Sequence, residues 1–280
     1  MKELKQVITL CGAKGGIAKS TSALYLAEAM MRGNKHLRIL IIDLDSQCNA
    51  SSLLGWSNNG GKTVYDSLID RNSLPVYPTN IKAGADDGGI FLCPGHPYLS
   101  SADRELQRRM QPKAVLRKCF ARDIQNYSDA NLPKDITEAF DYVIIDCPPA
   151  LNDLIFNAMS VSDGIIIPVQ TERLAIDAVS RMLAAYEEFR DEMKPDLKVF
   201  GILLTMVDER TRAAVALSEH IRSAFDEYVF STRIRRCTKV VEAQSLGRSL
   251  YDYAPFCKTA FDYERLSFEF INITNNISNI

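Results

Sequence analysis

A glycine-rich segment near the N-terminus carries the residue types of a phosphate-binding loop. Residues 11–21 read CGAKGGIAKST, after the apolar run QVITLC at 6–11 and before the helical pattern STSALYLAEAMMRG at 20–33. Backbone N–H groups converge in a turn between a strand and a helix, and the helix N-terminus adds partial positive charge. Lys19 is placed to reach the β- and γ-phosphates of a nucleotide, and the Ser20 hydroxyl to ligate Mg²⁺. The segment therefore predicts a nucleotide site, although a tight turn with a surface lysine is the simpler alternative.

Three aspartates follow buried-strand patterns and could complete a magnesium site. Asp43 and Asp45 end the run LRILIIDLD at 37–45, and Asp146 ends the apolar part of DYVIIDCPP at 141–149. In a doubly wound sheet the carboxyl ends of the strands border the ligand crevice. A strand-end aspartate holds Mg²⁺ through water, whereas a lone aspartate could equally cap a helix. The three aspartates together with the loop favour the metal-binding role.

Short apolar runs alternate with helical patterns along the chain. The runs lie at 6–11, 37–45, 89–94, 141–149, 163–170 and 199–208, and the helical patterns at 20–33, 101–125, 175–193 and 210–225. Runs with so little polar alternation are typical of strands buried on both faces. The pattern predicts a doubly wound α/β fold, with a mostly parallel sheet and flanking helices.

No internal repeat or linker divides the chain, so we expect a single domain over residues 1–280. The polar, Gly-rich stretch 55–89 predicts irregular surface structure with a short helix, and the Asn-rich tail 272–280 is expected to fray.

The composition is that of an ordinary globular protein, with 46% hydrophobic and 24% charged residues. No apolar run approaches the ~20 residues of a membrane helix, and the N-terminal one is too short for a signal peptide. The net charge of -2 means that nucleic acid could bind only through a local patch. Seven scattered cysteines, with no C-x-x-C motif, predict reduced thiols in a cytoplasmic protein rather than a disulfide framework or zinc site.

These motifs resemble the ParA/MinD group of deviant P-loop ATPases, and its ParA (Soj-like) branch fits best. The family loop K-G-G-x-G-K-[ST] matches residues 14–20, and DLDSQCNAS at 43–51 is similar to the family's D-x-D-P-Q-x-N-x-[ST] segment. The sequence DCPP at 146–149 resembles its second switch segment. The similarity runs from about residue 6 to 271 and is weakest over 56–140.

The resemblance implies ATP and Mg²⁺ as ligands and gives roles to individual residues. Lys14 would reach across an ATP-sandwich dimer to the partner's phosphates, like an arginine finger, or else would counter the phosphates of its own subunit. Asp45 would orient the attacking water, with Asp43 supporting the loop and the metal shell. The implied catalytic residues are Lys14, Lys19 and Asp45; the implied metal-site residues are Ser20, Asp43, Asp45 and Asp146. The implied nucleotide contacts are Lys14, Gly15, Gly16, Ile17, Ala18, Lys19, Ser20, Thr21, Met206 and Arg236.

Two departures from the family pattern affect these expectations. Ala18 stands where the family has glycine, and the segment that frames adenine in the family, I-P-R-N, is IRRC at 234–237. If position 18 requires a positive φ, a Cβ there costs ~1–2 kcal/mol, which is roughly 5- to 30-fold in affinity. If the backbone there is helical, alanine is harmless. We expect nucleotide binding to be retained, with a weakened site as the open alternative; the adenine contacts stay open.

Basic residues gather in the last part of the chain. Residues 231–250 contain Arg233, Arg235, Arg236, Lys239 and Arg248 against one acid, Glu242, and Arg210 and Arg212 could join them in space. Such a cluster is a footprint for a phosphate backbone, although a solvated charged face is the alternative. The resemblance implies non-specific DNA binding by an ATP-bound homodimer, with Arg210 and Arg236 at matching basic positions and Lys239 and Arg248 beside them.

The leading hypothesis is a slow ATPase that partitions plasmid or chromosomal DNA on the nucleoid, stimulated by a ParB-type centromere-binding partner. A MinD-like positioning ATPase for other cargo would need a basic amphipathic C-terminal helix, and no cation follows Arg265. An iron protein would need cluster cysteines, for which Cys93 and Cys119 lack the context. A DNA-binding scaffold with weakened nucleotide binding is a further alternative, only because Ala18 replaces the glycine of the family loop.

Overall fold

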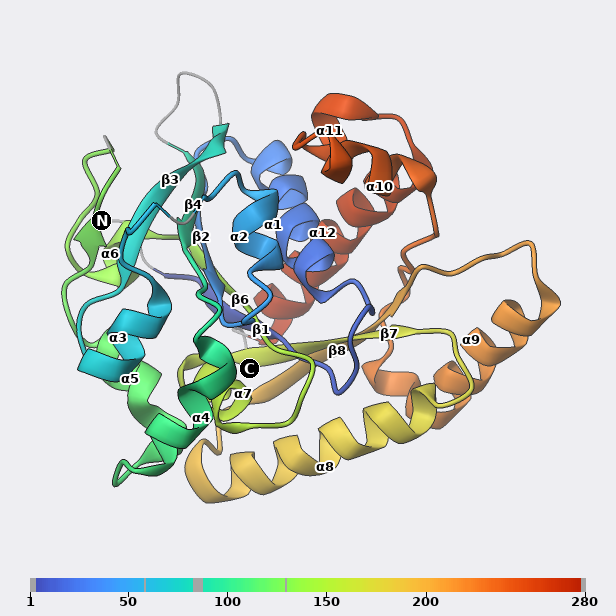
Figure 1. Cartoon of the computed structure of the whole chain (residues 1–280). Helices are drawn as coiled ribbons and strands as arrows, with labels where there is room; N and C mark the ends of the chain where they lie inside the picture. Colours follow the sequence, from blue (N-terminus) through green and yellow to red (C-terminus); the bar gives the residue numbers. More distant parts are fainter. Residues whose placement is uncertain (1–3, 58, 83–87, 129, 278–280) are drawn as a thin grey trace.

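A single twisted sheet forms the centre of the molecule in the computed structural model, which describes residues 4–57, 59–82, 88–128 and 130–277. Its strand order is β5-β3-β4-β2-β6-β1-β7-β8 (Figure 1). The strands are β1 (Gln6–Leu10), β2 (Arg38–Asp43), β3 (Pro75–Lys82), β4 (Gly89–Cys93), β5 (Gln125–Asn126), β6 (Tyr142–Asp146), β7 (Gly164–Gln170) and β8 (Lys198–Thr205). All pairings are parallel except that of β3 with β4, which is antiparallel. The doubly wound, mostly parallel fold that the sequence predicts is confirmed.

Helices cover both faces of this sheet, as Figure 1 shows. One face carries α1 (Lys19–Gly33), α2 (Asn49–Leu53), α10 (Thr238–Ser245), α11 (Leu250–Tyr253) and α12 (Lys258–Ile277). The other carries α3 (Val64–Asp70), α4 (Leu99–Gln107), α5 (Val115–Phe120), α6 (Ile136–Ala139), α7 (Asp153–Val161), α8 (Ala175–Met193) and α9 (Arg212–Phe225). Two short 3₁₀ turns, η1 (Pro112–Ala114) and η2 (Asp226–Tyr228), connect elements on this second face.

The apolar runs of the sequence are explained by this two-sided cover. Along β2, Leu40 and Ile42 pack into one core, and Ile39 and Ile41 into the other. Successive side chains of a strand point to opposite faces, so a strand covered on both sides must be apolar at every position.

The sequence prediction is wrong in three places. The helical pattern at 101–125 is broken into α4, η1 and α5, because Pro112 has no N–H to continue a helix. The stretch 55–89 contains the expected short helix, α3, but also the strand β3, whose Pro75 and Pro78 are tolerated because it lies near the sheet edge. Residues 83–87 lie outside the described part of the chain.

The third difference is at the C-terminus, where α12 continues to Ile277 instead of fraying from residue 272. Leu266, Phe270 and Thr274 recur at a helical spacing of four and are buried, at 0%, 0% and 3% exposure. Helix α12 packs along α1, so this buried stripe holds the Asn-rich segment in place. Residues 278–280 lie outside the described part.

Candidate nucleotide-binding site

The phosphate loop joins β1 to α1 in the centre of the sheet, where the strand order places β6 and β7 on either side of β1. Gly16 has φ 75° with no atom near an added Cβ, so the backbone conformation itself requires glycine. At Gly12, a Cβ would approach Cδ1 of Ile17 to 2.5 Å. Ile17 is buried, and its carbonyl accepts a hydrogen bond from the Thr205 hydroxyl at 3.0 Å. The end of β8 therefore braces the loop.

Ala18 ends the loop with φ 63° and ψ 31°, so the departure from glycine falls on a left-handed residue. It is the N-cap of α1, yet no side chain caps the helix, and the first turn contains no acid. A helix with an uncapped N-terminus leaves N–H groups and partial positive charge for an anion. The residues of that first turn, Lys19, Ser20 and Thr21, are those that the sequence assigned to the nucleotide.

The two loop lysines differ in their surroundings. Lys19 is 6% exposed, and its Nζ donates a hydrogen bond to the carbonyl of Lys14 at 3.0 Å, so its side chain folds back over the loop. The Lys14 side chain is 51% exposed and forms an ion pair with Glu172, in the segment after β7. An ion pair this exposed contributes about 0–1 kcal/mol, so Lys14 can leave it readily.

The Asp43 carboxylate organises the segment that follows β2. One oxygen accepts from the Asp45 N–H at 3.1 Å, and the other from the N–H and hydroxyl of Ser51 at 2.8 and 2.7 Å. Burial raises the pKa of Asp43 to about 6, against the lowering effect of these bonds. The predicted supporting role for Asp43 agrees with these contacts, but they leave its oxygens little capacity to ligate a metal directly.

Asp45 is 6% exposed, and its carboxylate accepts fewer hydrogen bonds than that of Asp43: Oδ1 accepts one, from the Gln47 N–H at 3.0 Å. Asp45 and Asp43 also define the space for Gly95, at the end of β4. An added Cβ on Gly95 would lie 3.0 Å from the Asp43 carbonyl oxygen and 3.1 Å from that of Asp45.

Asp146 is the unsatisfied acid of the site. It is 0% exposed and pairs in register with Asp43 across β6 and β2. Burial, and next the negative charge of Asp43, raise the pKa of Asp146 well above its usual range, while Lys19 opposes the shift. The Ser20 hydroxyl is close enough to lower that pKa, yet neither carboxylate oxygen has a well-formed hydrogen bond in the described structure. A buried acid without partners fits a place where a cation or its waters bind.

In the described residues, no three His, Cys, Asp or Glu side chains converge into a metal cage. In nucleotide sites Mg²⁺ keeps several waters and uses one or two carboxylates together with substrate phosphates. Ser20 and Asp146 are therefore the residues best placed to hold Mg²⁺, with Asp45 beside them. Bound Mg²⁺ would neutralise phosphate charge at this end of the loop.

The adenine side of the predicted site lies where the chain continues past Thr205, the last residue of β8. Met206 has φ 50°, and Val207 and Ile234 are joined by a 3.0 Å backbone hydrogen bond. The N–H of Arg236 donates to the carbonyl of Val207 at 3.0 Å, so residues 234–236 run beside the end of β8. The structure thus brings Met206 and Arg236 to one place, next to the strand end that braces the loop.

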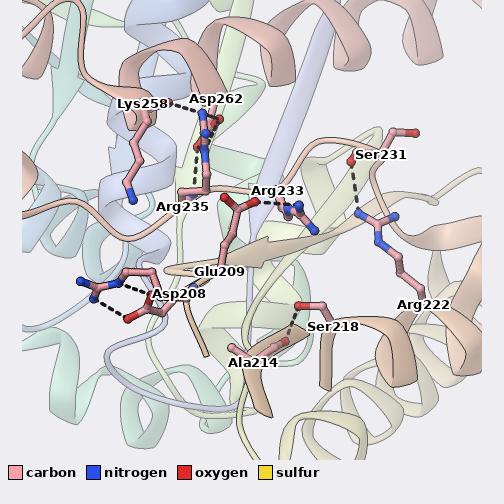
Figure 2. A network of polar contacts seen from close by, with 11 residues as sticks. Asp208, Glu209, Ala214, Ser218, Arg222, Ser231, Arg233, Arg235, Lys258 and Asp262 are labelled. Carbon is pink, nitrogen blue, oxygen red and sulfur yellow. Dashed lines mark hydrogen bonds and ion pairs between the residues drawn. The ribbon is translucent and has the colours of Figure 1, made fainter. Parts of the chain in front are cut away.

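The basic cluster is largely paired with acids. Two of these acids, Glu209 and Asp262, are distant in sequence from their arginines, so the count of one acid in residues 231–250 missed them. Arg233 pairs with Glu209 at 2.6 Å and Arg235 with the buried Asp262 at 2.7 Å, as Figure 2 shows. The remaining pairs are Arg210 with Asp208 at 2.7 Å and Lys239 with Glu242 at 2.8 Å. Arg248 donates to the Asp252 carbonyl at 3.0 Å. The pairing with Arg210 holds the pKa of Asp208 far below its usual range.

Arg236 differs from these neighbours. It is exposed, and its side chain makes no ion pair, hydrogen bond or ring contact with the residues that the structure describes. Glu209, the residue before Arg210, pairs with Arg233, so this part of the backbone lies near the cluster. That the side chains of Arg210 and Arg212 join the other cations stays a prediction.

Sequence reasoning missed four residues that hold the site together: Ser51, Gly95, Thr205 and Gln244. Ser51 and Gly95 complete the support of Asp43, because the Gly95 N–H donates to the Ser51 hydroxyl at 2.9 Å. The Gln244 amide donates to the Thr21 hydroxyl at 3.2 Å, linking α10 to the first turn of α1. Gly95 was detectable as a glycine just after a predicted strand, and Ser51 as the last position of the motif at 43–51. The contacts of Thr205 and Gln244 have no local signal.

Comparison with known proteins agrees with this geometry. A family model described as an AAA domain matches residues 5–199. The chromosome-partitioning ATPase Soj of Thermus thermophilus is 36% identical over 264 residues, covering 94% of each chain. The sporulation initiation inhibitor protein Soj of Bacillus subtilis is 31% identical over 265 residues, covering 94% of this chain and 97% of its own.

Solved structures share the fold. Cobyrinic acid a,c-diamide synthase of Mycobacterium smegmatis, with a bound ATP analog and magnesium, has a TM-score of 0.74 at 24% identity, covering 94% of this chain and 93% of that one. The septum site-determining protein MinD of Pyrococcus horikoshii, complexed with Mg-ADP, has a TM-score of 0.70 at 20% identity, covering 94% and 95%. The phosphate loop, the strand-end acids and the match to the Soj proteins along nearly the whole chain lead to one conclusion: this chain belongs to the ParA/Soj family of partition ATPases.

Proposed function

We propose that this chain partitions DNA through a cycle in which Mg·ATP closes a homodimer, the dimer binds DNA without sequence preference, and slow hydrolysis releases it. The observation that carries the proposal is the uncapped N-terminus of α1, with buried Lys19 beside the unpartnered carboxylate of Asp146. Positive charge and free N–H groups suit the phosphates, and the acid suits their Mg²⁺.

Dimer formation is supported by the surroundings of Lys14. This lysine and Leu174 line the same cavity of about 250 Å³, beside the phosphate loop. Leu174 is 65% exposed, and Leu151, in the segment after β6, is 38% exposed. An exposed leucine that lines the same cavity as a weakly held lysine suits a surface that a second copy covers.

DNA binding would use Arg236 first. Arg210 and Lys239 already pair with Asp208 and Glu242, so a DNA phosphate must compete with these carboxylates. At Arg236 there is no such competition in the described structure. A cytoplasmic chain on the nucleoid, and a ParB-type protein that accelerates hydrolysis, complete the proposal by analogy with the relatives named as partition proteins.

The decisive experiment measures binding to a non-specific DNA duplex by fluorescence anisotropy at one fixed salt concentration. We expect binding with Mg·ATP and much weaker binding with Mg·ADP or without nucleotide. Equal binding in all three conditions would contradict the cycle and favour the alternative of a nucleotide-independent DNA scaffold.

Arg236→Ala tests the DNA surface. It should weaken DNA binding and lower the salt slope by about one, with no change in ATP affinity. The matched control is Arg233→Ala, an exposed arginine three positions away that is already neutralised by Glu209. Loss of ATP affinity in Arg236→Ala would place that side chain at the nucleotide instead.

The alternative of a MinD-like positioning ATPase has one point in its favour, the MinD fold shared at TM-score 0.70. No helix in the described part of the chain combines the length and apolarity needed to cross a membrane. Binding of the Mg·ATP form to anionic vesicles but not to DNA would favour this alternative.

A further inference from the structure

Two cysteines that the proposed ATPase cycle does not use lie side by side at the edge of the predicted adenine site. Cys237 is the N-cap residue of α10, and Cys257 directly precedes α12. The Cys257 thiol interacts with the Cys237 thiol and with the N–H groups of Thr259 and Ala260, in the first turn of α12. Each thiol thus sits at the beginning of a helix, and the two meet.

The backbone segments that carry these thiols are tied together by several contacts. The Thr259 hydroxyl donates to the Arg235 carbonyl at 2.8 Å, and the Arg235 N–H donates to the Asp262 carboxylate at 2.9 Å. The Arg235 guanidinium adds an ion pair to Asp262 and a hydrogen bond to the Lys258 carbonyl at 3.3 Å, both drawn in Figure 2. Arg235, two residues before Cys237, is therefore held against Lys258 and Thr259, which directly follow Cys257, and this keeps the backbone segments of the two thiols close together.

The other cysteines of the chain are unsuited to oxidation. Cys11, Cys93, Cys119 and Cys147 are each 0% exposed, and burial raises their pKa. Cys48 is half-buried without a thiol partner, and burial together with Asp43 and Asp45 raises its pKa to about 12. Cys237 and Cys257 have the same intermediate exposure as Cys48, so an oxidant can reach them, and burial also raises the pKa of Cys257. They differ from Cys48 in having each other as thiol neighbours.

We propose that Cys237 and Cys257 form a reversible disulfide, and that this bond weakens nucleotide binding. The Cys237 thiol attacks a low-molecular-weight disulfide such as oxidised glutathione, forming a mixed disulfide and expelling one small thiol. Cys257 then attacks Cys237 Sγ, expelling the second small thiol. The two protein thiols lose two protons and two electrons, and the small disulfide is reduced to two thiols.

The effect on nucleotide binding rests on the proposed function. Cys237 occupies the last position of IRRC, which matches the adenine-framing segment of the family, and it directly follows Arg236. A bond to Cys257 converts the Cys237 thiol into a disulfide sulfur held toward α12, so its S–H can no longer donate a hydrogen bond to a base. We expect Mg·ATP affinity to fall about fivefold or more, equivalent to one hydrogen bond.

Peptide mass mapping tests the bond. Native protein is treated with oxidised glutathione, free thiols are alkylated, and the digest is analysed. A linked peptide pair containing Cys237 and Cys257, released by dithiothreitol, is expected in wild type and in the control Cys48→Ser. It should be absent from Cys237→Ser and Cys257→Ser. Alkylated Cys237 and Cys257, or glutathione adducts alone, would overturn the proposal.

Nucleotide titration tests the consequence. Oxidised wild type should bind Mg·ATP more weakly than reduced wild type, and Cys257→Ser should be insensitive to the oxidant. A linked peptide with unchanged affinity would refute control of nucleotide binding. If reduced wild type fails to bind Mg·ATP, the proposed ATPase cycle fails, while the peptide map still decides whether the disulfide forms.

Discussion

Ala18 has a backbone conformation, φ 63°, that glycine adopts at lower energy. A Cβ in the left-handed region costs ~1–2 kcal/mol, whereas glycine loses about 0.5–1 kcal/mol more chain entropy on folding. We therefore expect Ala18→Gly to raise the free energy of unfolding by up to about 1 kcal/mol, measured by chemical denaturation. The matched control is Gly16→Ala, at φ 75° in open space, which should lower it by a similar amount.

The same loop geometry bears on nucleotide affinity. Position 18 is left-handed in the described structure, and we expect the loop to keep this conformation on both sides of the binding equilibrium, so that the strain cancels. Ala18→Gly should accordingly change ATP affinity by less than about threefold. A tenfold gain in ATP affinity with an unchanged free energy of unfolding would mean that residue 18 becomes left-handed only when ATP binds. Ala18 would then weaken nucleotide binding, which is the alternative stated in the sequence analysis.

Asp45 and Asp43 lie two residues apart, yet their removal should have different results. Asp45 accepts one backbone hydrogen bond, so Asp45→Ala should cost about 1 kcal/mol and stop hydrolysis while Mg·ATP still binds, which traps the DNA-bound dimer. Asp43 accepts three hydrogen bonds, so Asp43→Ala should destabilise the fold by several kcal/mol. Phosphate release and denaturation separate the two outcomes, and loss of ATP binding in Asp45→Ala would refute its role.

Residues of the site were predictable from sequence only where their signal is local. Lys19, Ser20 and the strand-end acids lie within short patterns, so their types and spacing were sufficient to propose them as residues of one candidate site. Contacts such as Thr205 to Ile17 and Gln244 to Thr21 join residues 188 and 223 positions apart. The chain order carries no signal for them, because tertiary packing alone brings them together.

At the scale of elements, the interface of α1 with α10, α11 and α12 contains an unusual acid. Glu28 of α1 is 2% exposed; Ser249 donates to one carboxylate oxygen at 2.9 Å, and the other has no partner in the described structure. Burial raises the pKa of Glu28 to about 8; Asp252 raises it further, while Ser249 and Arg32 oppose this. Glu28 therefore carries a proton near neutral pH.

This acid should make stability depend on pH. The folded chain keeps the Glu28 proton up to about pH 8, whereas the unfolded chain loses it near 4.5. Folded protein thus binds one more proton between these values, and the free energy of unfolding falls as pH rises across that window.

Glu28→Gln should remove this dependence, and its free energy of unfolding should exceed that of wild type by about 4 kcal/mol at pH 8 and by less than about 1 kcal/mol near pH 5. Denaturation at several pH values measures it, and Glu219→Gln, on the exposed face of α9, is the control. Parallel pH profiles for wild type and Glu28→Gln would contradict the assignment.

Elements were predictable where periodicity was strong. The central strands read as apolar runs because both their faces are covered, and α8 spans the residues of its helical pattern, 175–193. Strand β3 was not predicted because Pro75 and Pro78 are typical of turns. Its antiparallel pairing with β4 depends on its position in the sheet, which the sequence does not encode locally. The last turns of α12 were not predicted because burial of Phe270, which packs on Phe200 of β8, and of Thr274 stabilises them rather than helix propensity.

At the scale of the whole molecule, the two lysines of the loop should separate nucleotide binding from assembly. Lys19 is buried over the loop of its own chain, whereas Lys14 is half-exposed and held only by Glu172. A lysine free to leave its own chain can contribute charge to phosphates bound by a second copy, and such charge is effective only when the dimer forms.

Sedimentation velocity with a non-hydrolysable Mg·ATP analog tests this separation. Wild type should shift from monomer to dimer, and Lys14→Ala should bind the analog yet stay monomeric. Glu172→Gln is the matched control, because it removes the resting ion pair but keeps the lysine, so it should dimerise at least as well as wild type. Dimerisation of Lys14→Ala equal to that of wild type would restrict Lys14 to the phosphates of its own subunit. Because Lys14 lies on the exposed side of the loop, its loss should leave the folded monomer intact, so the dimer signal reports assembly alone.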